Sequence, residues 1–177
     1  MVSNLLAICF DFGDTLVNEA TEVKDQTATT LYAELIPGAA RLIREIKVRG
    51  YRIALIADGR PGTYINVLSY YNLYSLFDAV AVSEIVGVTK PNPRLFTAAL
   101  DQLGITPKNY SRCVMVGNHL ARDIKGANDL GIISVWIDWA PRRSKVPANQ
   151  SEVPQYIIKK PLDLLELLPV LEKKLAG

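Results

Sequence analysis

The sequence predicts an α/β fold in which a parallel β-sheet is covered by helices on both faces. Short continuous apolar runs alternate with longer segments of helical period, which is the pattern of strands that are buried on both sides. The length of 177 residues suits a single domain, and an apolar content of 49% is sufficient for a full-sized core. We therefore expect residues 1–177 to form one three-layer domain.

Five apolar runs are expected to be the strands of this sheet, because each is short and is bounded by turn residues. The runs are residues 5–10, 52–56, 78–83, 112–116 and 132–137. The residues "YII" at 156–158 are a further candidate, as a short edge strand. The prediction is thus a five-stranded parallel sheet in a Rossmann-like arrangement.

The segments between these runs carry helix signals. Residues 37–50 begin with a proline and end with a glycine, as helices commonly do. The other predicted helices are residues 61–73, 91–104, 120–131 and 161–175. Pro169 lies within the last of them, and we expect it to kink this helix or to split off its last turn. Residues 138–155 contain three prolines and a basic cluster, which predicts a loop.

The composition argues against several classes of partner. Twenty basic and eighteen acidic side chains leave a formal charge of +2, which favours neither nucleic acid nor a membrane surface. No apolar stretch is long enough to cross a bilayer, and the first residues lack the basic region of a signal peptide. Cys9 and Cys113 lie in apolar runs, so we expect buried reduced thiols and a cytoplasmic protein.

Polar residues follow the predicted strands, at the edge of the sheet where open α/β proteins bind ligands. Carboxylates, an amide, a lysine and arginines are therefore expected to converge on one rim. The residues concerned are Asp11 after the first strand, Asp58, Gly59 and Arg60 after the second, Lys90 before a helix, Asn118, His119 and Asp123 after the fourth strand, and Arg142 and Arg143 after the fifth.

Four segments resemble, in order, the motifs of the haloacid dehalogenase superfamily, and together they span residues 6–137. They read "FDFGDTL", a strand ending in "ADG", "GVTKPNPRLF" and "VGNHLARDIKGANDLGI". The resemblance implies that Asp11 is a nucleophile that accepts a phosphoryl group and that Lys90 holds this nucleophile. It also implies that Mg²⁺ is bound by the Asp11 carboxylate, the Gly13 carbonyl and the last motif, through Asn118 or Asp123.

A cation is also expected on physical grounds. A carboxylate that approaches a phosphate meets a repulsion of about 4 kcal/mol for each pair of unit charges at about 4 Å, at an effective dielectric constant of about 20. Mg²⁺ prefers oxygen ligands and keeps several waters, so two or three protein oxygen atoms suffice to bind it.

The chain departs from the family pattern at three positions. Family phosphatases usually have a second aspartate, a general acid and base, where this chain has Gly13. Ala57 replaces a hydroxyl side chain that binds phosphate, and Asn118 replaces an acid. Asp14 is the candidate for the proton transfer, although adjacent side chains on an extended segment point in different directions. Loss of a general acid and base typically lowers the rate by about 10²–10⁴.

Each of these residues also has a structural interpretation. Gly13 allows a tight backbone path, and Asp14 suits a turn in which its side chain bonds the backbone. Asp58, Gly59 and Arg60 contact substrate or form an ordinary turn. Arg142 and Arg143 bind an anionic group through paired hydrogen bonds, or they lie on a solvated loop.

No segment is long enough for a separate cap domain, and only a flap-like turn at 16–26 fits. We therefore predict an open site, which favours a large phosphorylated substrate or coverage by a second copy in a homo-oligomer. The leading hypothesis is a capless Mg²⁺-dependent phosphomonoester phosphatase that forms an aspartyl-phosphate on Asp11. The alternatives are a non-catalytic binding or regulatory protein and a dehalogenase that forms an ester on Asp11. A receiver-like domain does not fit the order of the acidic residues.

Overall fold

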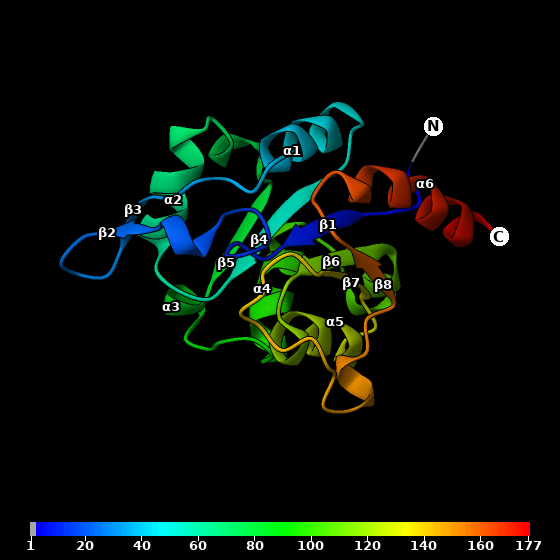
Figure 1. Cartoon of the computed structure of the whole chain (residues 1–177). Helices are drawn as coiled ribbons and strands as arrows, with labels where there is room; N and C mark the ends of the chain where they lie inside the picture. The colour runs from blue at the N-terminus through cyan, green and yellow to red at the C-terminus, as the bar shows by residue number, and fades with distance from the viewer. Residues whose placement is uncertain (1–2) are drawn as a thin grey trace.

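A computed structural model describes residues 3–177 and contains a six-stranded sheet in the order β5-β4-β1-β6-β7-β8 (Figure 1). All five neighbouring pairs are parallel, which confirms the predicted α/β class. The strands are β1 (Ala7–Phe10), β4 (Ile53–Ala57), β5 (Ala79–Val82), β6 (Cys113–Gly117), β7 (Ile133–Ile137) and β8 (Tyr156–Ile158).

The sixth strand corrects the predicted count of five. β8 pairs with β7 through Val135 and Tyr156 and through Ile137 and Ile158. A run of three residues carries too little periodicity to distinguish a strand from a loop. Residues 156–158 become a strand because they pair with the edge of β7, and this edge cannot be recognised from the sequence.

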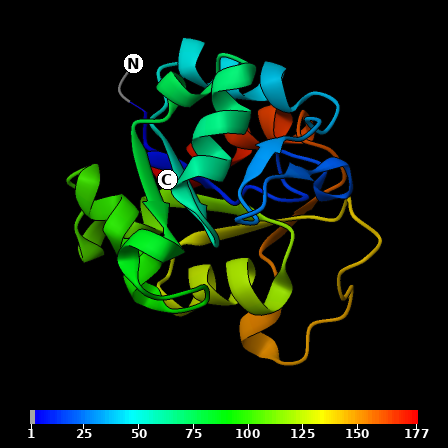
Figure 2. The ribbon, with the colours of Figure 1, turned by 90° about the vertical axis from the view of Figure 1, so that its left-hand side faces the viewer.

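The path of the chain creates a switch point in the centre of the sheet. From β1 the chain adds β4 and β5 on one side, and it then returns to add β6, β7 and β8 on the other. A crevice forms at the carboxyl ends of the strands at such a point. The segments that follow β1, β4 and β6 therefore meet at one edge of the sheet, and Figure 2 looks onto this edge.

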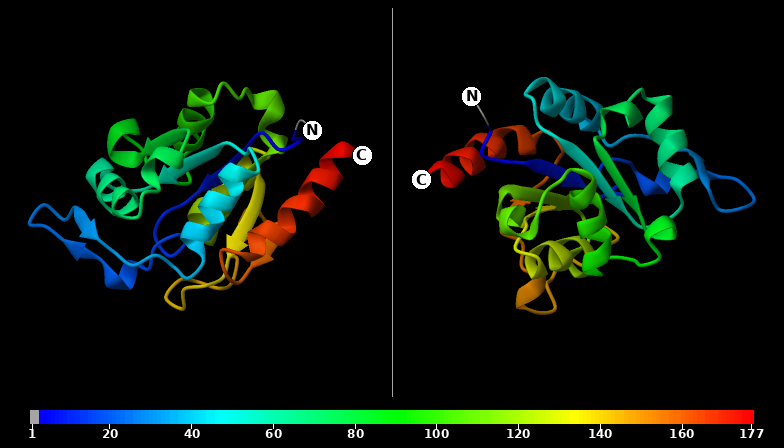
Figure 3. Two further views of the ribbon diagram at one scale, coloured as in Figure 1. Left: turned by 90° about the horizontal axis from the view of Figure 1, so that it is seen from above. Right: turned by 180° about the vertical axis from the view of Figure 1, so that it is seen from behind.

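Helices cover both faces of the sheet (Figures 1 and 3). One face packs α1 (Ala39–Val48), α2 (Pro61–Tyr70) and α6 (Asp163–Ala176) against apolar side chains that include Phe10 and Leu55. The opposite face packs α4 (Pro93–Gln102) and α5 (Lys125–Asp129). A short helix, α3 (Ser83–Val86), follows β5.

The two cysteines lie on the α4 and α5 side of the core. Cys9 and Cys113 are both free and buried, which confirms their predicted placement. Burial raises the pKa of each thiol, so both favour the neutral form.

Pro169 lies within α6 without ending it, so the predicted splitting of this helix is wrong. A proline cannot donate to the carbonyl four residues earlier, which here belongs to Leu165. The Arg49 side chain donates to that carbonyl at 3.3 Å. The hydrogen bond that proline removes from the helix is thus replaced by a residue beyond the end of α1.

The predicted flap is a β-hairpin that continues beyond residue 26. A 3-10 turn at Glu19–Thr21 leads into β2 (Val23–Lys24), which pairs antiparallel with β3 (Thr30–Tyr32). The hairpin projects at the end of the molecule opposite the two termini (Figure 3). Within residues 3–177, no helix has both the length and the apolar character that a bilayer crossing requires.

Gly126 allows α5 to approach α4 closely. A Cβ atom at position 126 would lie 2.3 Å from Cζ of Phe96. We expect Gly126→Ala to lower the free energy of unfolding by about 1–3 kcal/mol through overpacking, although alanine favours helix by about 1 kcal/mol. Urea unfolding followed by circular dichroism measures the change. The loss should be smaller in a Phe96→Leu background, and a stabilised Gly126→Ala protein would contradict the close contact.

Candidate active site

Lys90 lies between two buried carboxylates at the switch point of the sheet. Its Nζ atom is 2.5 Å from Oδ1 of Asp11 and 2.7 Å from Oδ1 of Asp123, and it also donates to the Ile56 carbonyl at 3.0 Å. Lys90 is 4% exposed and Asp123 is fully buried. The three residues that the sequence places on one rim are therefore in direct contact.

The charges in this cluster do not balance. Burial by itself lowers the pKa of Lys90, but the charges of Asp11, Asp123 and Asp58 outweigh this effect and raise the pKa above its ordinary value. Burial and the charge of Asp11 raise the pKa of Asp123, against the opposing effect of Lys90. The single Lys90 ammonium thus pairs with two adjacent carboxylates, so the cluster has an excess negative charge when both are ionised.

Asp11 is held by the end of β1 and by the turn that follows it. Its backbone N–H donates to the Val116 carbonyl of β6 at 2.9 Å. The Thr15 hydroxyl donates to Oδ2 of Asp11 at 3.2 Å, while Lys90 binds the other oxygen. Both carboxylate oxygens of Asp11 are therefore oriented by neighbouring donors.

Asp123 reaches the cluster because the segment after β6 is irregular. The predicted helix at 120–131 consists of a π-helical turn at Leu120–Ile124 followed by α5. Oδ2 of Asp123 accepts a hydrogen bond from the His119 backbone N–H at 2.9 Å. A Cβ atom at Gly117 would lie 2.4 Å from Asp123, so only glycine at this position leaves room for the carboxylate.

These residues line a cavity of about 300 Å³ at the carboxyl edge of the sheet. Asp11, Lys90, Asn118 and Asp123 form part of its wall. Glu22, Lys24 and Thr30 of the hairpin region also line it. The predicted open site is thus corrected in part, because the hairpin supplies a wall although it is too small to be a cap domain.

The oxygen atoms of the cavity suit a hard divalent cation such as Mg²⁺. Asp11 and Asp123 carry one more negative charge than Lys90 neutralises, and Asn118, which lines the same cavity, adds an uncharged amide oxygen. Within residues 3–177, no group of three or more His, Cys, Asp or Glu side chains is arranged to hold a metal ion. A site for Mg²⁺ would thus rest on only two carboxylates, with the Asn118 amide oxygen and the Gly13 carbonyl as uncharged donors, and these oxygen types fit the ion.

Comparison with known proteins identifies the family. Residues 20–131, more than half of the chain, match the model of the haloacid dehalogenase-like hydrolases. The chain belongs to the haloacid dehalogenase-like hydrolases. The resemblance predicted from the four motifs is thus confirmed.

Curated relatives of this chain are named phosphatases. The chain is 30% identical over 142 residues to the glyceraldehyde 3-phosphate phosphatase of Methanopyrus kandleri, which covers 80% of this chain and 60% of the relative. It is 36% identical over 104 residues to the phosphoserine phosphatase of Thermus thermophilus, covering 59% of this chain and 41% of the relative. The chain spans at most 60% of the length of these relatives.

Solved structures share the fold of this chain at low sequence identity. A phosphatase of the family from Thermococcus onnurineus has a TM-score of 0.75 and 18% identity, over 93% of this chain and 98% of that structure. A crystal structure described as a dehalogenase has a TM-score of 0.76 and 17% identity, over 94% and 98% of the two chains. The fold alone therefore does not distinguish between the two reactions.

The placement of Asp14 contradicts its predicted part in catalysis. Asp14 has a φ angle of 51° and is 1% exposed, and it does not line the cavity. Its Oδ1 atom accepts from the Glu19 backbone N–H at 3.1 Å, and its Oδ2 atom pairs with Arg142 Nε at 2.6 Å. The Asp14 carboxylate is thus engaged in holding two loops together.

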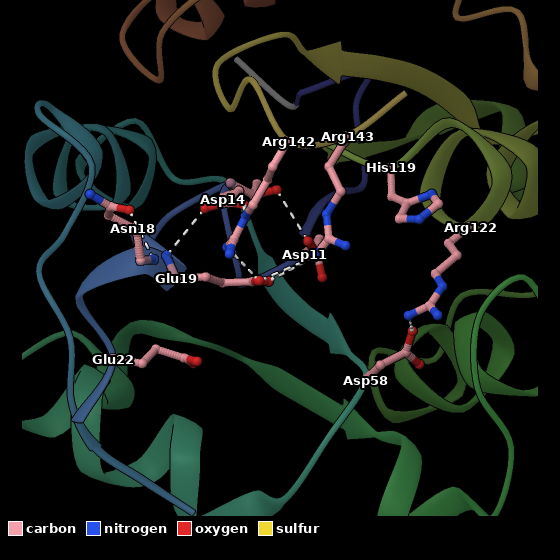
Figure 4. Close-up of polar contacts among 12 residues, drawn as sticks. Asp11, Asp14, Asn18, Glu19, Glu22, Asp58, His119, Arg122, Arg142 and Arg143 are labelled. Carbon is pink, nitrogen blue, oxygen red and sulfur yellow. Dashed lines mark hydrogen bonds and ion pairs between the residues drawn. The ribbon is translucent and has the colours of Figure 1, made fainter. Parts of the chain in front are cut away.

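Arg142 is likewise not placed to bind a substrate, which corrects the prediction for this residue. Its guanidinium bridges Asp14 and Glu19, with an Nη2–Oε2 distance of 2.5 Å to Glu19, and it does not line the cavity (Figure 4). Arg143 pairs with Glu19 at 3.1 Å and does line the cavity. Of the two adjacent arginines, only Arg143 remains a candidate for anion binding.

The residues after β4 line the cavity, and Asp58 also binds the backbone of a neighbouring segment. Its Oδ1 atom accepts from the Lys90 backbone N–H at 3.0 Å, and its Oδ2 atom is 3.4 Å from Arg122 Nη1. Gly59 and Arg60 line the same cavity, and Arg60 lies 3.7 Å from Glu84. Asp58 thus positions the backbone that carries Lys90.

His119 lines the cavity as well, next to Asn118. Burial and the nearby charges of Arg122 and Arg143 lower its pKa, so the imidazole favours the neutral form near pH 7. Arg122, for which no role was predicted, also lines the cavity, together with Arg60 and Arg143.

Glu19 is the main site residue that sequence reasoning missed. Its carboxylate lies so close to Gly13 that a Cβ atom at position 13 would be 1.9 Å from Oε1. Burial and the charge of Asp14 raise the pKa of Glu19, Arg142 and Arg143 lower it, and the net shift is upward. The only signal in the sequence is the small residue at position 13, which does not indicate what fills the space.

Proposed function

We propose that this hydrolase is a Mg²⁺-dependent phosphomonoester phosphatase that forms an aspartyl-phosphate on Asp11. The observation that carries the proposal is the Asp11 carboxylate at the switch point, held by Lys90 and Thr15 and opening on the cavity. Relatives that are named phosphatases support the reaction type.

Asp11 attacks the phosphorus atom, so that an Asp11 O–P bond forms and the ester P–O bond breaks. Lys90 holds one oxygen of Asp11 and offsets the negative charge of the incoming phosphate. Arg143 and Arg122 supply further positive charge on the cavity wall. Magnesium, bound by Asp11, the Gly13 carbonyl, Asn118 and Asp123, would supply Lewis-acid charge for the phosphoryl oxygens.

We infer the substrate class from the size of the cavity. A volume of about 300 Å³ is at the lower end of ligand sites and suits a phosphoryl group with a small organic part. Two of the relatives are named for small phosphorylated compounds, glyceraldehyde 3-phosphate and phosphoserine. A larger phosphorylated substrate would extend past the hairpin.

We also propose that the protein acts in the cytoplasm, because its two cysteines are free and buried and reduced thiols are typical of that compartment.

The proposal is tested by phosphate release from p-nitrophenyl phosphate, glyceraldehyde 3-phosphate and phosphoserine. We expect turnover that requires Mg²⁺ and stops when EDTA is added. Glu34→Gln, a change of an exposed carboxylate outside the cavity, is the control and should retain the wild-type rate.

Two other outcomes would contradict the proposal. Binding of Mg²⁺ or phosphate without turnover of any ester would favour the binding or regulatory alternative, in which no acid is needed at position 13. Halide release from 2-haloacids without phosphate release would favour a dehalogenase, whose fold is similar.

A further inference from the structure

The space beside Gly13 is occupied by a carboxylate from another part of the chain. A Cβ atom at position 13 would lie 1.9 Å from Oε1, 2.5 Å from Cδ and 2.6 Å from Cγ of Glu19. These distances are far below any van der Waals contact, so a side chain at 13 and the present position of Glu19 exclude each other. The Glu19 carboxylate therefore fills the volume that the missing aspartate would require.

Glu19 is held in this position by contacts on both its backbone and its side chain. Its backbone N–H donates to Asp14, and its Oε2 atom pairs with Arg142 at 2.5 Å and with Arg143 at 3.1 Å. Figure 4 shows the side chain extending from the 3-10 turn toward the two guanidinium groups, on the side of the cavity where Asp11 lies. The Glu19 side chain is 28% exposed and lines the cavity, so it is accessible to a ligand.

We propose that Glu19 transfers the proton in the phosphatase reaction, in place of the aspartate that is absent at position 13. This inference rests on the proposed function. As Asp11 attacks phosphorus and the ester P–O bond breaks, the Glu19 carboxyl gives its proton to the leaving oxygen, and an alcohol departs. Glu19 carboxylate then takes a proton from the water that attacks the aspartyl-phosphate, which releases inorganic phosphate and restores Asp11.

Two other carboxylates near the site are less suitable for this step. Asp14 is buried and absent from the cavity wall. Glu22 is engaged on the hairpin, where it accepts from Thr30 at 3.0 Å and pairs with Lys24 at 2.7 Å. Within the described residues, Glu19 is the carboxylate that occupies the side-chain space of position 13.

The first test compares two leaving groups in Glu19→Gln, which keeps the size of the side chain. Hydrolysis of an alkyl phosphate such as phosphoserine should fall by about 10²–10⁴, because an alkoxide leaves poorly without a proton. Phosphorylation by p-nitrophenyl phosphate should be less affected, since nitrophenolate needs no proton to leave. A burst of one nitrophenolate per active site should follow, because the water step still lacks its base. Glu34→Gln should behave as wild type on both substrates.

The second test moves the acid back to position 13. Gly13→Asp alone should reduce activity, because the new side chain collides with Glu19. In Glu19→Ala the space is empty, so the double variant Gly13→Asp/Glu19→Ala should be at least about tenfold more active than Glu19→Ala alone. This gain cannot arise from a merely structural effect of removing Glu19.

The outcomes separate this inference from the proposed function. An inactive wild-type protein would overturn both. An active wild-type protein with unchanged rates in Glu19→Gln, or with equal losses on the two substrates and no burst, would overturn the assignment of Glu19 and leave the phosphatase proposal intact. A double variant that is no more active than Glu19→Ala would also overturn the assignment of Glu19 as the proton-transfer residue.

Discussion

Asp11→Asn is expected to abolish phosphate release, with a loss in kcat of about 10⁴-fold or more. The amide is a poor nucleophile, so the aspartyl-phosphate cannot form. The substitution keeps the size of the side chain and leaves an oxygen that can accept from Lys90 or Thr15, so the fold should be retained. Steady-state release of phosphate measures the loss, and acid quenching with a radiolabelled phosphate ester tests for label on the protein.

Asp101→Asn, a change of an exposed carboxylate on α4, is the matched control and should leave both activity and labelling unchanged. Label that persists in Asp11→Asn, or a rate equal to that of the wild type, would show that another group is the nucleophile.

Lys90→Met is expected to lower the free energy of unfolding by about 3–5 kcal/mol, because it leaves two buried carboxylates without their shared cation. Methionine replaces much of the apolar volume of the lysine stem, so the loss should come mainly from charge. Urea unfolding in the presence of EDTA measures the effect.

Two further measurements distinguish charge from packing. Asp123→Asn in the Lys90→Met background should recover part of the stability, since it removes one of the two adjacent charges. Mg²⁺ should also recover part of it if the ion binds Asp11 and Asp123. A Lys90→Met protein that is as stable as the wild type would contradict the shared ion pair.

The centre of the site could be predicted because its geometry follows from the topology. Parallel strands bring their carboxyl ends to one edge, so residues that follow β1 and β6 must lie near each other. Asp11, Lys90 and Asp123 are in contact as this argument requires. The approximate ranges of the five long strands and of the longer helices were also predictable, since periodicity records which side of each element is buried.

The choice between Asp14 and Glu19 could not be predicted from the sequence. The direction of the Asp14 side chain depends on a left-handed backbone at φ 51°, which turns it away from the cavity. Its partner Arg142 lies 128 residues away in the chain, in a loop without a regular pattern. Spacing along the chain contains no information on such a pair.

The α/β class, the family motifs and the acidic and basic residues at the rim could be read from the residues alone, because the periodicity of burial and the residues that end each apolar run are local properties of the chain. The folded structure was needed to show that β8 joins the sheet, that Arg49 supports the helix at Pro169, and that Glu19 fills the space beside Gly13. Each of these depends on which distant segments pack together, and a side chain acquires its partner only when the folded chain brings the two into contact.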